Sequence, residues 1–116
     1  MKIAIPTSNG QLAEHFGHCR QFTFFDIEHE QIRGITFKDA PPHKPGLLPS
    51  WLAENGTTDI IAGGIGQKAI HLFNLLGINV LAGASMMTPE EIITGYLEKT
   101  IAFSSNYCDH KEHNCK

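Results

Sequence analysis

The clearest pattern of apolar and polar residues lies between Asp59 and Ala84. Asp59–Ala62 is a short apolar run that enters a pair of glycines, which is typical of a strand buried on both faces. The spacing then becomes helical, and the apolar face of this predicted helix consists of Ile65, Ala69, Leu72, Phe73 and Leu76. Gly77 ends the helix, and Ile78–Leu81 forms a second apolar strand. The stretch therefore predicts a βαβ unit with two parallel strands and a right-handed crossover.

The N-terminal part of the chain has the alternation and composition of strands. Lys2–Ile5 is a short strand that Pro6 is expected to end. A long polar loop, Thr7–Arg20, follows it. Gln21–Glu28 and Gln31–Lys38 are both rich in β-forming residues, and the two residues between them predict a hairpin, although His-Glu is an unusual turn pair.

Two further helices complete the predicted domain. The first carries an apolar stripe and ends at Asn55-Gly56; the stripe consists of Leu47, Leu48, Trp51 and Leu52. The second begins at Thr88-Pro89-Glu90-Glu91, where Thr is the N-cap, Pro occupies the first helical position and the second Glu closes a capping box. Its buried face consists of Ile92, Ile93, Tyr96 and Leu97.

The order of these elements defines the fold class. A hairpin at one side and parallel crossovers at the other predict an α/β protein with a mixed five-stranded sheet and helices on its faces. The Lys2 strand and the Asp59 strand should lie side by side in the centre. Residues 1–103 form one domain, and the polar residues 104–116 form a flexible tail rich in Cys and His.

Composition narrows the function classes. The net charge of −3, without a basic cluster, argues against nucleic acid as a partner. No apolar run reaches membrane-spanning length, and the first residues enter a strand rather than a signal peptide, so no membrane role is expected. Three cysteines, an odd count, suit a reducing compartment, and the protein is therefore expected in the cytoplasm.

The turn Gly63–Gly66 leaves backbone N–H groups at a helix N-terminus, where an anion can bind, and Lys68 adds a positive charge one turn further on. The segment Gly64–Ala69 also matches the dinucleotide fingerprint G-x-G-x-x-A. However, the next strand does not end in the acidic residue that would hold a ribose, and no Gly-Lys-Ser/Thr follows the glycines. A nucleotide, another anion, and glycines that serve packing alone all remain open.

The predicted polar loop contains His15, His18 and Cys19, whose imidazole and thiol groups suit zinc, copper or iron–sulfur species. The alternative is that His15 caps a turn and Cys19 is a small buried apolar residue. Cys19 has no evident oxyanion hole or third orienting group, which argues against nucleophilic catalysis. The first strand carries no carboxylate for a two-metal nuclease, and the chain is not expected to be an enzyme.

The C-terminal tail contains four potential ligands in the array C-x-H-x-x-H-x-C: Cys108, His110, His113 and Cys115. These residues could hold zinc or another divalent metal. Their spacing is tighter than in familiar zinc folds, so transient binding by a disordered tail is the preferred interpretation.

Two segments together resemble the dinitrogenase iron–molybdenum cofactor biosynthesis family, which is related to nitrogenase accessory proteins. They are KIAIPTSNGQLAEHFGHCRQFTFFDIE and DIIAGGIGQKAIHLFNLLGINVLAGA, and the resemblance runs from Lys2 to about Leu97. It implies a ribonuclease-H-like fold and a small carrier domain for iron–molybdenum cofactor, its precursors or other metal–sulfur clusters. The histidine of the family's H-F-G-x segment falls on His18.

The expected function is therefore non-catalytic binding and delivery of an anionic metal–sulfur cluster, with cluster-assembly or cluster-accepting proteins as partners. The residues expected to bind the cluster are His18, Cys19, His15, Gly63, Gly64, Ile65, Gly66 and Lys68. The alternative is an enzyme or regulatory module that binds a small-molecule phosphate or a nucleotide at the Gly63–Gly66 turn.

Overall fold

The computed structural model describes residues 1–14, 16, 19–41, 47–84, 87–99 and 105–107. The described strands are β1 (Lys2–Ser8), β2 (Gln11–Leu12), β3 (Gln21–Glu28), β4 (Gln31–Asp39), β5 (Asp59–Ile61), β6 (Asn79–Ala82) and β7 (Ser105–Tyr107). The described helices are α1 (Leu47–Glu54), α2 (Gln67–Leu75) and α3 (Pro89–Glu98).

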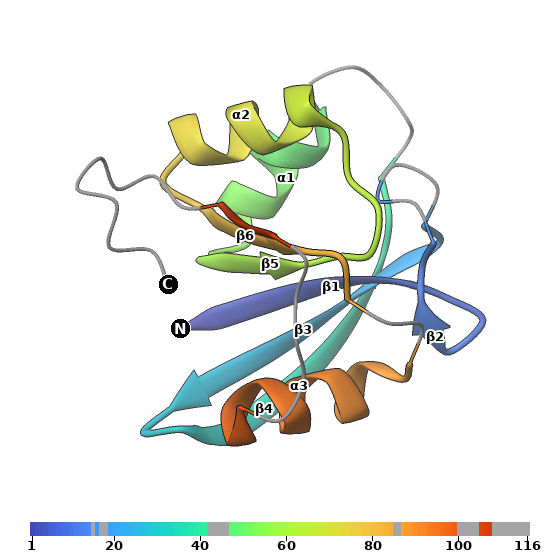
Figure 1. Cartoon of the computed structure of the whole chain (residues 1–116), viewed down its shortest axis with the longest axis vertical. Coiled ribbons are helices and arrows are strands. Elements are labelled where there is room, and N and C mark those ends of the chain that lie inside the picture. The colour runs from blue at the N-terminus through green and yellow to red at the C-terminus, as the bar shows by residue number, and fades with distance from the viewer. Residues whose placement is uncertain (15, 17–18, 42–46, 85–86, 100–104, 108–116) are drawn as a thin grey trace.

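These strands form one mixed sheet in the order β4-β3-β1-β5-β6-β7, with β2 paired to β1 beside this path (Figure 1). The central strand β1 runs parallel to β5, and β5 runs parallel to β6. Strands β3 and β4 form an antiparallel hairpin at one side. The predicted βαβ unit, the hairpin and the central pairing of the first strand with the Asp59 strand are therefore confirmed.

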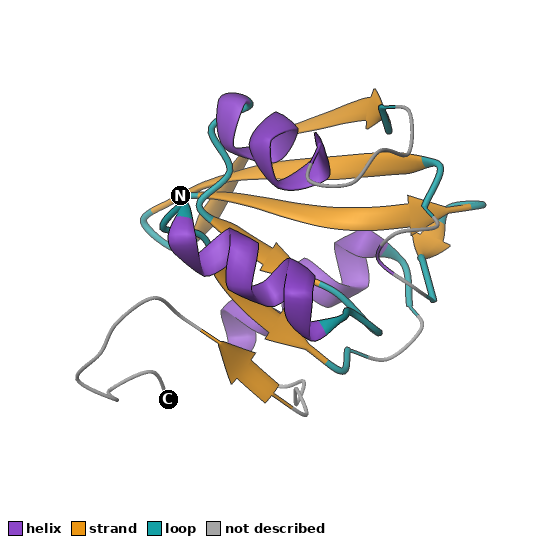
Figure 2. Cartoon of the chain, turned by 90° about the horizontal axis from the view of Figure 1, so that it is seen from above, coloured by secondary structure: helices purple, strands orange, loops and turns teal. Residues whose placement is uncertain are grey.

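Helices cover both faces of the sheet: α1 and α2 lie on one face and α3 on the other (Figures 1 and 2). The alternation along β3 separates its aromatic side chains between these layers, because successive residues of a strand point to opposite faces. The core beneath α1 and α2 consists of Ala4, Phe16, Phe22, Phe24, Leu52, Ile60, Ala62, Ile70, Phe73, Ile78 and Val80. The core beneath α3 consists of Ile3, Ile5, Leu12, Phe25, Ile27, Ile61, Ala84, Ile92 and Ile93.

Local sequence signals set the helix ends. At the start of α3, the Glu91 N–H donates to the Thr88 hydroxyl at 3.2 Å, and the Thr88 N–H donates to the Glu91 carboxylate at 3.0 Å. This is the predicted capping box. After α2, Gly77 has a φ of 77°, which a glycine adopts without strain. Helix α2 begins at Gln67 rather than Ile65, because Gly66 is still extended with φ −78° and ψ 155°.

The hairpin turn explains how an unusual residue pair is accommodated. His29 and Glu30 have φ values of 54° and 62°, as a type I′ turn requires at both central positions. The apolar alternation of the flanking strands therefore determines the turn, even though neither residue favours a positive φ.

The sheet has more strands than the five that were predicted, because β2 and β7 were not expected. Strand β1 also continues past Pro6, which was expected to end it, as far as Ser8. The Pro6 carbonyl accepts a hydrogen bond from the Ala13 N–H at 2.8 Å, on the side of β1 away from β3. Since the N–H and C=O of a strand residue point the same way, the missing N–H of Pro6 costs no bond to β3.

Two segments predicted to lie outside the core contribute to it or to the sheet. The predicted loop 7–20 contains β2 and buries Leu12, Ala13 and Phe16, each 5% exposed or less. At the C-terminus, Ser105–Tyr107 pairs antiparallel with β6, although these residues were assigned to the tail. The pairing is made by backbone groups at the edge of β6, and it requires no apolar pattern in the added strand.

Candidate functional site

Backbone hydrogen bonds join the histidine-containing loop to the glycine turn. The Phe16 N–H donates to the Gly64 carbonyl at 2.8 Å, and the Gly64 N–H donates to the Glu14 carbonyl at 3.1 Å. Glu14 and Phe16 therefore both pair with Gly64 through their backbone groups. The two segments that were expected to bind one cluster meet here, at the carboxyl ends of β1 and β5.

Phe16 anchors this loop in the core. Its ring packs edge-to-face against Phe73 at a centroid distance of 5.3 Å and against Phe22 at 5.7 Å. Phe16 was not among the residues predicted to form the site. The available signal was a single large aromatic side chain within a polar stretch, which requires burial even when its neighbours do not.

The two ends of the glycine turn differ in what an added side chain would meet there. A Cβ on Gly63 would lie 3.4–3.6 Å from Leu12 and from the carbonyls of Ala13 and Glu14, which is ordinary van der Waals contact with the loop. A Cβ on Gly66 would meet nothing within 4 Å, and its backbone conformation is open to any residue. Packing therefore requires glycine at neither position, but a side chain would touch the loop at Gly63 and meet open space at Gly66.

The N-terminus of α2 has no side-chain cap, because its N-cap residue is Gly66. The first turn of α2 contains no acidic residue, and Lys68 is exposed there. Thr88 and Glu91, in contrast, satisfy the first N–H groups of α3. Since the first N–H groups of any helix have no partner within the helix, the α2 terminus offers donors and a partial positive charge to an external acceptor. Ile65, which was expected among the binding residues, packs against the core.

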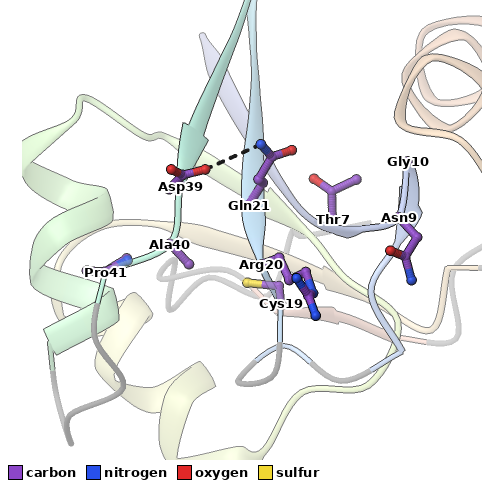
Figure 3. Close-up of a pocket in the computed structure, with 9 residues that line it drawn as sticks. All are labelled: Thr7, Asn9, Gly10, Cys19, Arg20, Gln21, Asp39, Ala40 and Pro41. Carbon is purple, nitrogen blue, oxygen red and sulfur yellow. Dashed lines mark hydrogen bonds between the residues drawn. The ribbon is translucent and has the colours of Figure 1, made fainter.

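Cys19 lies beside this region, at a pocket of about 530 Å³ (Figure 3). The pocket is lined by Thr7, Asn9, Gly10, Cys19, Arg20, Gln21, Asp39, Ala40 and Pro41. The Gln21 amide donates to the Asp39 carboxylate at 3.3 Å across its rim. The Cys19 side chain is half-buried and also packs against the core beneath α1 and α2. Arg20 and Asp39 were not singled out by sequence reasoning, because only the fold brings them to one pocket.

Burial sets the protonation state of Cys19. Desolvation raises the pKa of its thiol to about 11, and a hydrogen bond to the backbone opposes this effect without reversing it. The thiol is therefore protonated at neutral pH in the absence of a ligand. A metal or cluster that binds the sulfur must displace this proton, because the thiolate is the ligand form.

We expect alkylation of Cys19 by iodoacetamide to show a pH midpoint near 11 in the folded protein and near 9 in urea. Only the thiolate reacts, so at pH 8 this difference lowers the reactive fraction about a hundredfold. The measurement uses a chain with Cys108→Ser and Cys115→Ser, so that labelling reports Cys19 alone. Limited access would slow the reaction without moving its midpoint. Equal midpoints in the folded and unfolded chains would therefore contradict the assignment.

Several predicted ligands lie outside the described residues: His15, His18 and the tail residues Cys108, His110, His113 and Cys115. Within the described part of the chain, no group of three or more His, Cys, Asp or Glu side chains is arranged to hold a metal ion. Both metal-binding hypotheses remain predictions. The helices of the described residues include none that is both long and apolar enough to span a membrane.

The arrangement defines a class of protein: a small mixed α/β domain in which a histidine-containing loop is bonded to a glycine turn at an uncapped helix. The profile of the family "Dinitrogenase iron-molybdenum cofactor" matches residues 1–99. The chain belongs to this family.

The chain is also similar to individual proteins and solved structures. The chain is 35% identical over 103 residues to the uncharacterized protein MJ0580 of Methanocaldococcus jannaschii, and the match covers 84% of this chain and 86% of the relative. The crystal structure of PH0822 superposes with a TM-score of 0.83 at 30% identity, over 90% of this chain and 95% of that one. The apo form of the orange protein from Desulfovibrio gigas shares the fold, with a TM-score of 0.70 at 19% identity over 91% and 94% of the two chains.

Proposed function

We propose that the protein is a non-catalytic carrier for an anionic metal–sulfur cluster, namely iron–molybdenum cofactor, a precursor of it or a related molybdenum or iron cluster. Membership of the cofactor-related family supports an association with this chemistry. The proposal includes a cytoplasmic location, cluster-assembly or cluster-accepting partners, and the ribonuclease-H-like arrangement of the fold that the resemblance implies.

The pairing of Glu14 and Phe16 with Gly64 carries this proposal. Through this pairing, one short region contains two kinds of group that such a cluster needs. The loop that holds His15, His18 and Cys19 supplies soft ligands, which suit metal–sulfur species. The uncapped α2 terminus with Lys68 supplies backbone donors and positive charge, which complement an anion.

Each group has a distinct role in the proposed complex. His18 is the principal ligand, and Cys19 and His15 are secondary. The high pKa of Cys19 makes its contribution dependent on proton release. The Gly63–Gly66 turn and Lys68 bind through charge and hydrogen bonding, without a covalent link to a metal. In this proposal each of these groups only holds the cluster, so the protein binds and transfers it without a catalytic step.

Anaerobic titration of the empty protein with tetrathiomolybdate, followed by visible absorption and by molybdenum analysis after dialysis, tests the proposal. We expect stoichiometric retention of molybdenum and no competition by ATP or NAD. Competition by either nucleotide, or failure to retain molybdenum, would favour the alternative of a phosphate- or nucleotide-binding module.

Replacement of His18 by Ala should weaken retention of the thiomolybdate by about tenfold or more, because loss of even an outer-shell partner of a metal ligand costs 10–100-fold in affinity. The matched control is His29→Asn, which changes an exposed histidine at the far end of the hairpin and suits its positive φ. Circular dichroism checks that both variants fold. Unchanged affinity in a folded His18→Ala protein would remove His18 from the site.

A further inference from the structure

Strand β4 is an edge strand that exposes a row of large apolar side chains. In the described sheet β4 pairs only with β3 and ends the strand order (Figure 1). Its apolar stripe consists of Ile32, Ile35 and Phe37, which are 39%, 43% and 59% exposed. These residues stand opposite Ile27, Phe25 and Thr23 of β3. Directly opposed residues share a face, so the stripe extends the apolar face that α3 covers further along the sheet.

The C-terminal half of β4 has only part of the usual protection of an edge strand, two charged residues at its end. Edge strands are commonly guarded by an outward lysine or by a bulge. Lys38 is engaged on the opposite face, where its ammonium group donates to the Asn55 side chain and lies 5.9 Å from the Phe24 ring. The irregularity in the β3–β4 pairing falls near the hairpin turn, at Asp26/Ile27. The pairing is regular from Gly34 to Asp39.

We propose that β4 pairs antiparallel with β4 of a second copy of this chain, about a two-fold axis at Thr36. This pairing would join the two sheets into one and place both apolar stripes on the same face. In this register Ile35 of each copy stands opposite Phe37 of the other, and Thr36 stands opposite its own copy. Aromatic–β-branched and Thr–Thr pairs are both favourable across strands.

Charge complementarity selects the second copy as the occupant of this edge. The Thr36 register brings Arg33 of each copy, which the β3–β4 pairing skips at its irregularity, to the end of the other strand that carries Asp39, twice by symmetry. If the two-fold axis passed through Ile35 instead, Arg33 of one copy would stand opposite Phe37 of the other. If it passed through Phe37, Ile35 of one copy would stand opposite Asp39 of the other. One register therefore satisfies both the apolar and the charged positions. Arg33 is 54% exposed and, within its own chain, lies 3.6 Å from Glu28, a solvent-exposed ion pair of small energetic value.

Sedimentation velocity over increasing protein concentration tests this proposal. We expect a reversible dimer with a dissociation constant of about micromolar order. Phe37→Lys should raise this constant at least about tenfold, because it sets a lysine against Ile35 and beside a like charge on the second copy. The matched control is Leu75→Lys on α2: Leu75 is 68% exposed but lies away from β4, and this change should leave the constant unaltered. Ile35→Lys serves as a second stripe variant if Phe37→Lys fails the folding check by circular dichroism.

A charge swap tests the register. Arg33→Asp alone should weaken the dimer, since it places two acidic residues opposite each other, and the additional change Asp39→Arg should restore it. A wild-type chain that stays monomeric at all concentrations would overturn the proposal and leave the edge to a different protein. A dimer insensitive to Phe37→Lys would place the interface elsewhere, and failure of the swap to restore association would overturn the Thr36 register.

Discussion

Phe73→Ala should lower the free energy of unfolding by about 3–5 kcal/mol. Phe73 is fully buried in the core beneath α1 and α2. Its truncation removes apolar burial and leaves a cavity that the β-sheet cannot close, because the strands are held by their hydrogen bonds. The change also removes the edge-to-face contact with Phe16, which anchors the histidine-containing loop.

Equilibrium denaturation in urea measures this effect from the transition midpoint and slope. The control is Leu75→Ala, two residues further along the same helix, where the side chain is 68% exposed. That substitution should change the free energy by no more than about 0.5 kcal/mol. A loss below about 1 kcal/mol for Phe73→Ala would mean that α2 is not packed on the sheet in the way described.

The second large effect is expected in binding rather than stability. Gly66→Asp should weaken tetrathiomolybdate binding at least about tenfold while leaving the fold intact. A unit negative charge about 6 Å from this dianion costs about 1.4 kcal/mol even at the dielectric constant of water, which corresponds to tenfold. The new carboxylate would also accept hydrogen bonds from the N–H groups that the proposal assigns to the cluster.

Gly66→Asn separates these two contributions, because Asn caps a helix about as well as Asp but carries no charge. Both variants should fold with a stability within a few tenths of a kcal/mol of wild type, since a side chain at Gly66 meets open space and its backbone is extended. We expect the affinity to decrease in the order wild type, Asn, Asp. If all three proteins bound tetrathiomolybdate equally, the α2 terminus would not be part of the binding site.

The elements that were predicted correctly depend on neighbours in the sequence. The capping box at Thr88 and Glu91 and the glycine that follows α2 act over a few residues, so their residue types suffice to locate helix ends. The hairpin similarly follows from two adjacent alternating strands.

The errors occurred where distant backbone decides the outcome. Pro6 lies within β1 because its missing N–H faces away from β3. Residues 105–107 become a strand because the edge of β6 is available to them. Neither condition can be read from the residue types, since each concerns which segment lies beside the chain.

The candidate site shows the same division. Residue chemistry alone indicated candidate soft ligands in the loop and a candidate anion site at the glycine turn with its lysine, because side-chain type determines what a group can bind. The tertiary structure supplied the contact between their segments, through the hydrogen bonds of Glu14 and Phe16 with Gly64. It also distinguished Gly63, where a side chain would touch the loop, from Gly66, where a side chain would meet open space. These features depend on contacts between segments far apart in the chain, and the local sequence does not indicate which distant segments will be in contact.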